Sequence, residues 1–216
     1  MNRPRPEEAI HIVGICGSIR PGSFTRMALA SALAGATASG AATRLIDLRD
    51  YNLPFVTAPK GPEQQLADVQ RLRSDVKAAD GIILATPEYH GSFSGVLKNA
   101  IDLMGFEEFE GKMLGLVGVS GGRMGAFDAL NTLRSVGRAL HAWVLPEQVS
   151  IPEAWSVFNS EGRISDRKLE QRLSETVPKS HASPESTSAP LPNSSCRNGR
   201  TPQTTRAATH ASRISK

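Results

Sequence analysis

Five short apolar runs, separated by longer amphipathic stretches, dominate the hydrophobic pattern of this 216-residue chain. The runs predict β-strands at 10–16, 42–48, 81–85, 113–119 and 143–150. Proline interrupts the last run at position 146, which indicates an edge strand or a bulge there. Because the runs are almost continuously apolar rather than alternating, they predict a parallel sheet that is buried on both faces.

The stretches between and after these runs predict helices at 23–39, 63–79, 93–105, 125–141 and 165–173. Ser23 is well placed to cap the first helix, and Gly40 is well placed to end it. Two aromatic residues near the last strand, Trp143 and Trp155, are interpreted as packing or interface residues. Strands that alternate with helices predict an α/β fold with helices on both faces of one sheet.

Composition divides the chain into a loose lead-in at 1–9, a folded domain at 10–173 and a disordered tail at 174–216. The tail contains no Phe, Tyr or Trp, so it cannot bury enough apolar surface to offset its ordering entropy. A flexible tail and a shifted reading frame both fit this composition.

The positive charge of the chain is unevenly distributed. Residues 1–173 carry 19 Lys/Arg and 19 Asp/Glu, whereas the tail carries 6 Lys/Arg and 2 Asp/Glu, so the net charge of +4 lies in the tail. We therefore expect no nucleic-acid-binding face on the domain.

The sequence disfavours disulfide-rich, metal-binding, secreted and membrane proteins. The two cysteines, Cys16 and Cys196, form no C-x-x-C motif, which favours a reduced compartment, and Cys16 is interpreted as a buried apolar residue. The five histidines are scattered without metal-ligand spacing, so we expect no metal site. The first apolar run is too short and polar for a signal peptide, and no run approaches the roughly 18 apolar residues of a membrane helix. We expect a cytoplasmic protein without membrane contact.

The loop that follows the first predicted strand, at 17–23, leads directly into a helix. It offers backbone N–H groups, the hydroxyls of Ser18 and Ser23, the guanidinium of Arg20 and, one turn later, the hydroxyl of Thr25. A helix N-terminus binds phosphate well, and an arginine can pair with phosphate bidentately. The spacing matches neither G-x-G-x-x-G nor a P-loop. A plain turn with a capping serine fits the loop as well as a phosphate site does.

The loop that follows the third predicted strand, at 86–92, combines a proline, a carboxylate, an aromatic ring, an imidazole and a glycine. Gly91 permits close backbone approach, and Tyr89 or His90 can lie over the face of a heterocycle. Glu88 is interpreted equally as a site residue or as a helix-capping or interface carboxylate. His90 is interpreted equally as a direct participant or as an exposed loop residue. No nucleophile elbow G-x-S-x-G is present, which disfavours a catalytic triad.

The loop that follows the fourth predicted strand, at 120–125, is rich in glycine. Gly121 and Gly122 allow the main chain to approach a ligand, and Arg123 adds charge. A loop that merely needs positive φ fits equally well. Because the carboxyl ends of parallel strands meet at one edge of the sheet, where ligands bind, the three loops together predict a site for a phosphorylated, planar ligand.

Together these loops resemble those of the NADPH-dependent FMN reductase family, a flavodoxin-like group that includes quinone, chromate and azo-dye reductases. The resemblance spans about 10–173, and four motifs carry it: Gly17-Ser18-x-Arg20-x-x-Ser23, Pro87-Glu88-Tyr89-His90-Gly91-Ser92, Leu97-Lys98-Asn99-Ala100-Ile101-Asp102 and Ser120-Gly121-Gly122-Arg123-x-Gly125. It implies a flavodoxin-like three-layer sandwich with a five-stranded parallel sheet of order 2-1-3-4-5. The ligand would bind where the strand order reverses, as in flavodoxin itself.

The resemblance also implies bound FMN, with NADPH or NADH as co-substrate and no catalytic side chain, because the flavin itself transfers the hydride. The implied cofactor-binding residues are Ser18, Arg20, Ser23, Phe24, Thr25, Pro87, Glu88, Tyr89, His90, Gly91, Ser120, Gly121, Gly122 and Arg123. Arg20 and Arg123 are also candidates for attracting the phosphates of NADPH.

The implied partners are a small-molecule electron acceptor (a quinone, chromate, an azo dye or free flavin), reduced by a ping-pong mechanism, and further copies of the chain. The copies would form a homodimer or homotetramer, with the helix at 93–105 contributing to the contact. Two other functions stay open, a flavodoxin-type electron carrier and a flavin-binding module without turnover.

Overall fold

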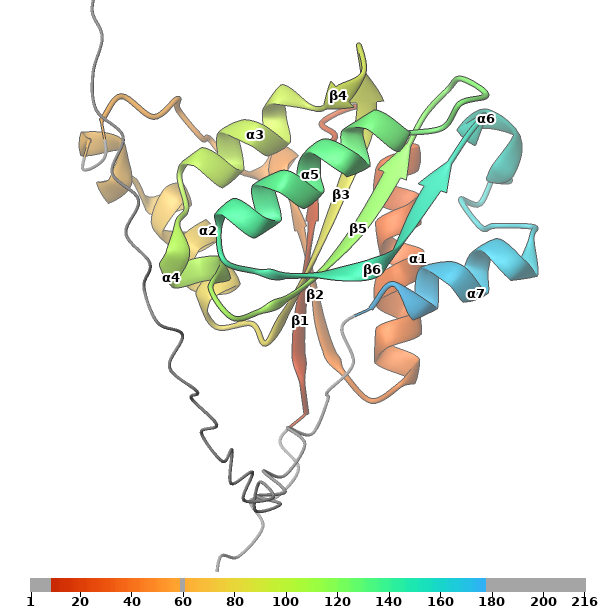
Figure 1. Ribbon diagram of the computed structural model, residues 1–216, viewed down its shortest axis with the longest axis horizontal. Helices are drawn as coiled ribbons and strands as arrows, with labels where there is room; N and C mark the ends of the chain where they lie inside the picture. Colours follow the sequence, from red (N-terminus) through yellow and green to blue (C-terminus); the bar gives the residue numbers. More distant parts are fainter. Residues whose placement is uncertain (1–8, 59–60, 178–216) are drawn as a thin grey trace, which may run out of the picture. The chain divides into compact units, whose positions relative to one another are not determined.

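The computed structural model describes residues 9–58 and 61–177, which form a parallel sheet with helices on both faces (Figure 1). The sheet order is β2-β1-β3-β5-β6. These are the predicted strands, at β1 (His11–Cys16), β2 (Ala42–Asp47), β3 (Gly81–Tyr89), β5 (Met113–Val119) and β6 (Trp143–Ile151). Counted without the short strand β4, the order is the predicted 2-1-3-4-5, so that prediction is confirmed. Most of the predicted lead-in at 1–9 and of the predicted disordered tail at 174–216 falls outside the described residues. The predicted start of the tail at 174 was wrong, because α7 (Arg167–Glu175) passes through it and Val177 is buried in the core.

The third strand is longer than predicted. Its ladder with β5 extends to Pro87, and the chain then continues to Tyr89 and folds back as β4 (Ser92–Phe93), antiparallel to β3. His90 and Gly91 join the two strands with φ angles of 52° and 73°. Two consecutive positive φ angles are typical of a two-residue hairpin turn whose twist matches that of its strands. The predicted loop at 86–92 is therefore mostly a β-hairpin.

The long helices overlap the predicted ones, at α1 (Phe24–Ala38), α2 (Ala67–Lys77), α3 (Gly95–Asp102), α5 (Phe127–Ala139) and α7 (Arg167–Glu175). Ser23 caps α1 as predicted, because its Oγ accepts a hydrogen bond from the amide of Arg26. The predicted helix at 63–79 is interrupted at Leu66, whose backbone is extended, so its start is the separate 3-10 helix η2 (Pro62–Gln65). Short elements that the periodicity did not predict are η1 (Leu48–Asp50), α4 (Phe106–Phe109) and α6 (Ala154–Val157). No helix in the described parts of the chain has the length and apolar character needed to cross a membrane.

Both faces of the sheet are buried, as the apolar runs predicted. In β1, Val13 and Ile15 pack in one cluster with side chains of α2, α3 and α5. Ile12 and Cys16, which alternate with them, pack in a second cluster with side chains of α1 and α7. This alternation produces three layers, in which α2, α3 and α5 cover one face and α1 and α7 cover the other (Figure 1).

The irregularity predicted around Pro146 is present. Strand β6 is an edge strand, and its register against β5 shifts between Leu114 and Leu116. The guanidinium of Arg134 donates to the carbonyl oxygens of Leu145 and Pro146, at 2.8 and 2.6 Å. These bonds satisfy carbonyl groups that the interrupted ladder leaves without a strand partner.

Candidate functional site

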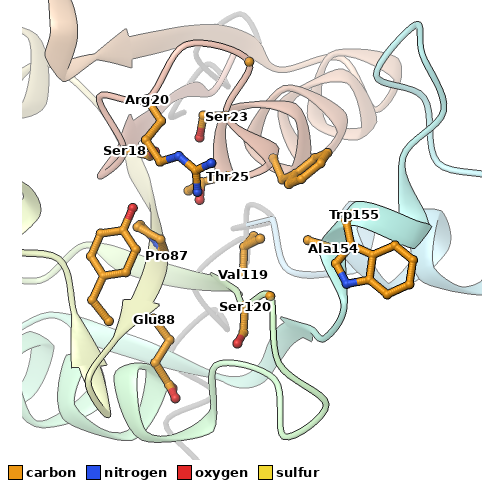
Figure 2. A pocket seen from close by; sticks show the side chains of 14 residues that line it. Ser18, Arg20, Ser23, Thr25, Pro87, Glu88, Val119, Ser120, Ala154 and Trp155 are labelled. Carbon is orange, nitrogen blue, oxygen red and sulfur yellow. The ribbon is translucent and has the colours of Figure 1, made fainter.

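A cavity of about 270 Å³ lies at the carboxyl edge of the sheet (Figure 2). The segments that follow β1, β5 and β6 meet there with the last residues of β3 and β5, as a parallel topology requires. Most of the predicted site residues line this cavity, namely Ser18, Arg20, Ser23, Phe24, Thr25, Pro87, Glu88, Tyr89, Ser120 and Gly121. Residues from three separate motifs of the sequence therefore share one wall.

Three hydroxyl side chains of the cavity come from the loop after β1 and the first turn of α1. Ser18, Ser23 and Thr25 are only 4%, 8% and 2% exposed, yet all three line the cavity. Within the described residues, no hydrogen bond engages Oγ of Ser18 or Oγ1 of Thr25, and no fully buried side-chain oxygen lacks a partner. The two hydroxyls therefore open onto the cavity, where they can bond to a ligand.

Positive charge faces the same hydroxyls. Figure 2 shows the guanidinium of Arg20 turned toward Ser23 and Thr25. Among the described residues Arg20 forms no ion pair, and α1, fifteen residues long, begins a few residues after it, at Phe24. A helix N-terminus carries about half a positive charge, so this corner of the cavity is suited to an anion with several acceptor oxygens.

The loop after β1, at 17–23, is held in place by hydrogen bonds to neighbouring elements. The amide of Gly17 donates to the carbonyl oxygen of Ala85, at 2.7 Å. Oγ of Ser94, which caps α3, donates to the carbonyl oxygen of Gly17, at 2.6 Å. The first strand, the third strand and the start of α3 thus position the loop that carries Ser18 and Arg20.

The carboxylate of Glu88 caps a helix, which was one of its two interpretations; its role toward a cofactor stays a prediction. Its Oε2 accepts a hydrogen bond from the amide of Ala129, at 3.0 Å, in the first turn of α5. The N-cap residue of this helix is Ala126, whose side chain cannot accept a hydrogen bond. Figure 2 shows the carboxylate of Glu88 pointing away from Arg20. Glu88 therefore contributes its stem to the cavity wall and its charge to α5.

Four predicted residues are not part of the cavity wall. His90 and Gly91 form the exposed tip of the hairpin between β3 and β4. Gly122 and Arg123 are exposed in the glycine-rich loop, and the Arg123 side chain is 90% exposed with its Nε 3.3 Å from Oε1 of Glu153. Their role toward a ligand stays a prediction.

The sequence did not point to the part of the wall that follows β6. Ala154 and Trp155, at the start of α6, line the cavity together with Gly22 and Val119. Figure 2 shows Trp155 on the side of the cavity opposite Pro87. One signal was available in the sequence, since α6 follows the fifth long strand and so belongs to the same edge of the sheet.

Two buried groups at the ends of β1 and β2, the thiol of Cys16 and the carboxylate of Asp47, stabilise the fold. Burial raises the pKa of the Cys16 thiol to about 11, so it stays protonated and packs as an apolar residue, as predicted. Asp47, at the end of β2, is buried and lies 2.6 Å from Arg49 and 3.0 Å from Arg26. Burial acts to raise the pKa of Asp47, but hydrogen bonds from these arginines bring it below its ordinary value.

The family model for NADPH-dependent FMN reductases matches residues 10–156. The chain belongs to this family. An NAD(P)H-dependent FMN reductase of Pseudomonas aeruginosa is 35% identical over 176 residues, which cover 78% of this chain and 91% of that protein. The NADPH-dependent FMN reductase ArsH of Shigella flexneri is 32% identical, over 78% of this chain and 66% of ArsH. The motif-based expectation of an FMN-using, NAD(P)H-dependent oxidoreductase is thus confirmed at the level of the family.

A shorter match joins the chain to an NADPH azoreductase of a Bacillus species, at 39% identity over 105 residues. This match covers 49% of the chain and 58% of the azoreductase. Among solved structures, the NADH:FMN oxidoreductase EMOB superposes with a TM-score of 0.64 at 24% identity, covering 78% of this chain and 88% of EMOB. FerB of Paracoccus denitrificans superposes with a TM-score of 0.63 at 21% identity, covering 78% of this chain and 95% of FerB. These similarities confirm the flavodoxin-like fold.

Proposed function

We propose that the protein is an FMN-dependent NAD(P)H oxidoreductase that reduces small-molecule electron acceptors. One observation carries the proposal: buried hydroxyls of Ser18 and Thr25 open onto a cavity at the N-terminus of α1, under the guanidinium of Arg20. Hydroxyl donors, helix amides and a guanidinium together suit a phosphate monoester, which FMN carries. Family membership supports FMN over other phosphorylated ligands.

The remaining wall residues are assigned to the flavin ring. Pro87 is buried at the end of the β3 ladder, and Tyr89 is half-exposed beside it. Ser120 and Gly121 line the cavity from the next strand. In this proposal Arg20, Ser18, Ser23 and Thr25 hold the phosphate, while these residues of β3 and β5 bound the ring. His90, Gly91, Gly122 and Arg123 are assigned to the rim, where substrates enter.

When bound, FMN supplies a ring that can take up a hydride and release electrons to an acceptor. In the net reaction with a quinone, NADPH gives up a hydride and becomes NADP⁺. The quinone takes up the two electrons and the proton of that hydride, together with one proton from water, and becomes a hydroquinone. We assign no general base, because hydride loss from NADPH removes no proton. One open face that serves both substrates in turn predicts ping-pong kinetics. The same proposal includes assembly into a homodimer or homotetramer, with α3 in the contact. It also includes a reducing, cytoplasmic location.

The visible spectrum of the purified protein tests the proposal most directly. We expect flavin absorption bands that bleach when NADPH is added without oxygen and that return when a quinone is added. Bands that persist after NADPH would contradict reductase activity and favour an electron carrier. A protein that contains no flavin and does not bind added FMN would contradict the assignment of the cavity.

The phosphate assignment has a test of its own. We expect Arg20→Ala to weaken FMN binding by about 10- to 100-fold, since a hydrogen bond to a charged group contributes about 1.5–3 kcal/mol. Riboflavin lacks the phosphate, so its affinity should differ little between the variant and the parent protein. Titration of the apoprotein with each flavin, followed by flavin fluorescence, measures both values. Equal losses for FMN and riboflavin would place the phosphate away from Arg20.

A further inference from the structure

The indole of Trp155 is a large apolar surface on the wall of the cavity. Its side chain is 65% exposed, although it lines the same cavity as the buried Ser18 and Thr25. Figure 2 shows it beside Ala154, across the cavity from Pro87. The indole ring is therefore accessible to a ligand that enters the cavity, because most of it is not covered by the described part of the chain.

The backbone that carries Trp155 is held rigidly. The amide of Ala154 donates to the carbonyl oxygen of Ser120, at 3.0 Å, and the amide of Glu153 donates to that of Gly122, at 3.2 Å. The amide of Ser120 in turn donates to the carbonyl oxygen of Ile151, at 2.9 Å. The start of α6 and the glycine-rich loop therefore form one unit at the end of β5 and β6.

Aromatic packing also holds the end of α6 against the start of α1. Phe158, which follows α6, is buried and stacks on Phe24 with ring centroids 5.5 Å apart. Phe24 begins α1 and also lines the cavity. With its flanks held on both sides, Trp155 can stack on a ligand at a small cost in conformational entropy, since a tryptophan has only two rotatable side-chain bonds.

We propose that Trp155 is the surface on which planar aromatic electron acceptors stack, so that the segment after β6 determines acceptor specificity. This inference rests on the proposed oxidoreductase function. The positive groups of the cavity lie at the loop after β1, whereas Trp155 is apolar and lies after β6. An aromatic acceptor gains from the indole by stacking and apolar burial, while a small inorganic anion gains nothing from it.

Spectroscopy can detect this contact without turnover. The chain has two tryptophans, and Trp143 is a matched control because it begins β6, at the opposite end of the strand, and is 69% exposed. In FMN-loaded Trp143→Phe protein, we expect the remaining indole N–H resonance to shift saturably with oxidised 2-methyl-1,4-naphthoquinone and not with hexacyanocobaltate(III), a diamagnetic anion of the same charge as ferricyanide. In Trp155→Phe protein, the Trp143 resonance should stay in place. A Trp155 resonance that does not move would overturn the proposal.

Kinetics provide the second measurement. With saturating NADPH, we expect Trp155→Ala to raise KM for the naphthoquinone about tenfold and to leave kcat/KM for ferricyanide within about twofold, as lost stacking predicts. Trp155→Phe should recover most of the loss because it restores an aromatic face. Trp143→Ala should match the parent protein with both acceptors.

Other results would have distinct meanings. An equal loss with both acceptors, or a tenfold weaker affinity for FMN in Trp155→Ala, would overturn the proposal and assign Trp155 to the cofactor site. A parent protein that NADPH does not reduce would contradict the proposed function instead, and the resonance shifts, which need no NADPH, would still test the aromatic site.

Discussion

The carboxylate of Glu88 and the amide of Ala129 are joined by a hydrogen bond of 3.0 Å between the end of β3 and the first turn of α5. This bond joins the strand that carries Pro87 and Tyr89, which line the cavity, to the helix that follows the glycine-rich loop. It also places a negative charge at a helix N-terminus, where the helix dipole favours it. A sequence motif that resembles a ligand-binding loop thus contains a residue whose charge serves the fold.

Replacing Glu88 should therefore destabilise the protein. We expect Glu88→Ala to lower the free energy of unfolding by about 1–2 kcal/mol, since it removes a helix cap. Glu88→Gln should lose about half as much, because the amide oxygen can still accept the bond. Urea denaturation measures both values. Glu147→Ala, an exposed position on β6, is the control and should change stability by less than about 0.5 kcal/mol; if Glu88→Ala behaves like this control, the cap contributes nothing.

A side chain at Gly17 should disturb the phosphate loop. A Cβ there would lie 2.9 Å from both the carbonyl oxygen of Ala85 and the Cβ of Leu97, neither of which can rotate away. We expect Gly17→Ala to cost about 1–3 kcal/mol, the usual effect of overpacking, and to weaken FMN binding. Gly95→Ala, where an added Cβ meets no atom within 4 Å, should leave both unchanged. Thermal unfolding and FMN titration compare the variants, and indistinguishable results would contradict the close approach.

The stability contributed by Asp47 should depend on pH in a defined direction. The folded protein lowers the pKa of Asp47 below 3.8. A lowered pKa means that the stabilisation is complete above the unfolded value and is lost as the pH falls through the folded value. We expect Asp47→Asn to lower the free energy of unfolding by about 1–2 kcal/mol at pH 7, since it removes a buried charge that pairs with two arginines. The loss is no larger because both arginine side chains are partly exposed.

This deficit should shrink as the pH falls below about 4, because the parent protein then loses the same interactions. Chemical denaturation across a pH series measures the difference. Asp50→Asn, an exposed neighbour, is the control and should show neither the deficit nor its pH dependence. A deficit that stays constant down to pH 2 would show that the charge of Asp47 is not its source.

The thiol of Cys16 should be nearly inert in the folded protein. Burial raises its pKa from 9.0 to about 11, which lowers the thiolate population about a hundredfold at neutral pH, and thiolate is the reactive form. In a Cys196→Ser background, Cys16 is the one remaining cysteine. We expect a disulfide reagent to label it at least a hundredfold more slowly in buffer than in guanidinium chloride. Rapid labelling in buffer would contradict the packing of β1 against α1.

Local sequence signals were sufficient for most of the architecture. The apolar run that contains Ile12 and Ile15 predicted a strand buried on both faces, and the structure places its alternate side chains in two different clusters. Ser23 predicted the start of α1, and its Oγ caps that helix. Periodicity missed α4 and α6 because a single helical turn is too short to repeat a pattern.

The predicted strand end at position 85 was wrong for a different reason. A proline at position 87 favours a break in a strand, but here the backbone of β3 continues to pair with Val119 of β5 through this position. The hairpin to β4 then depends on positive φ at His90 and Gly91. His-Gly is not one of the usual residue pairs of such a turn, which are Asn-Gly, Asp-Gly and Gly-Gly, so the sequence did not indicate it.

Local residue patterns predicted the parallel sheet with helices on both faces and the three loops that meet at one edge, because the period of apolar residues is set within short stretches of chain. The strand order was predicted from the resemblance to the FMN reductase family. Which side chains in those loops face the cavity depends on the folded structure. The carboxylate of Glu88 points to α5 because the N-terminus of that helix lies beside it. Trp155 lines the cavity because a backbone hydrogen bond attaches the start of α6 to Ser120. Both outcomes depend on partners distant along the chain, and no local pattern of residues encodes their positions.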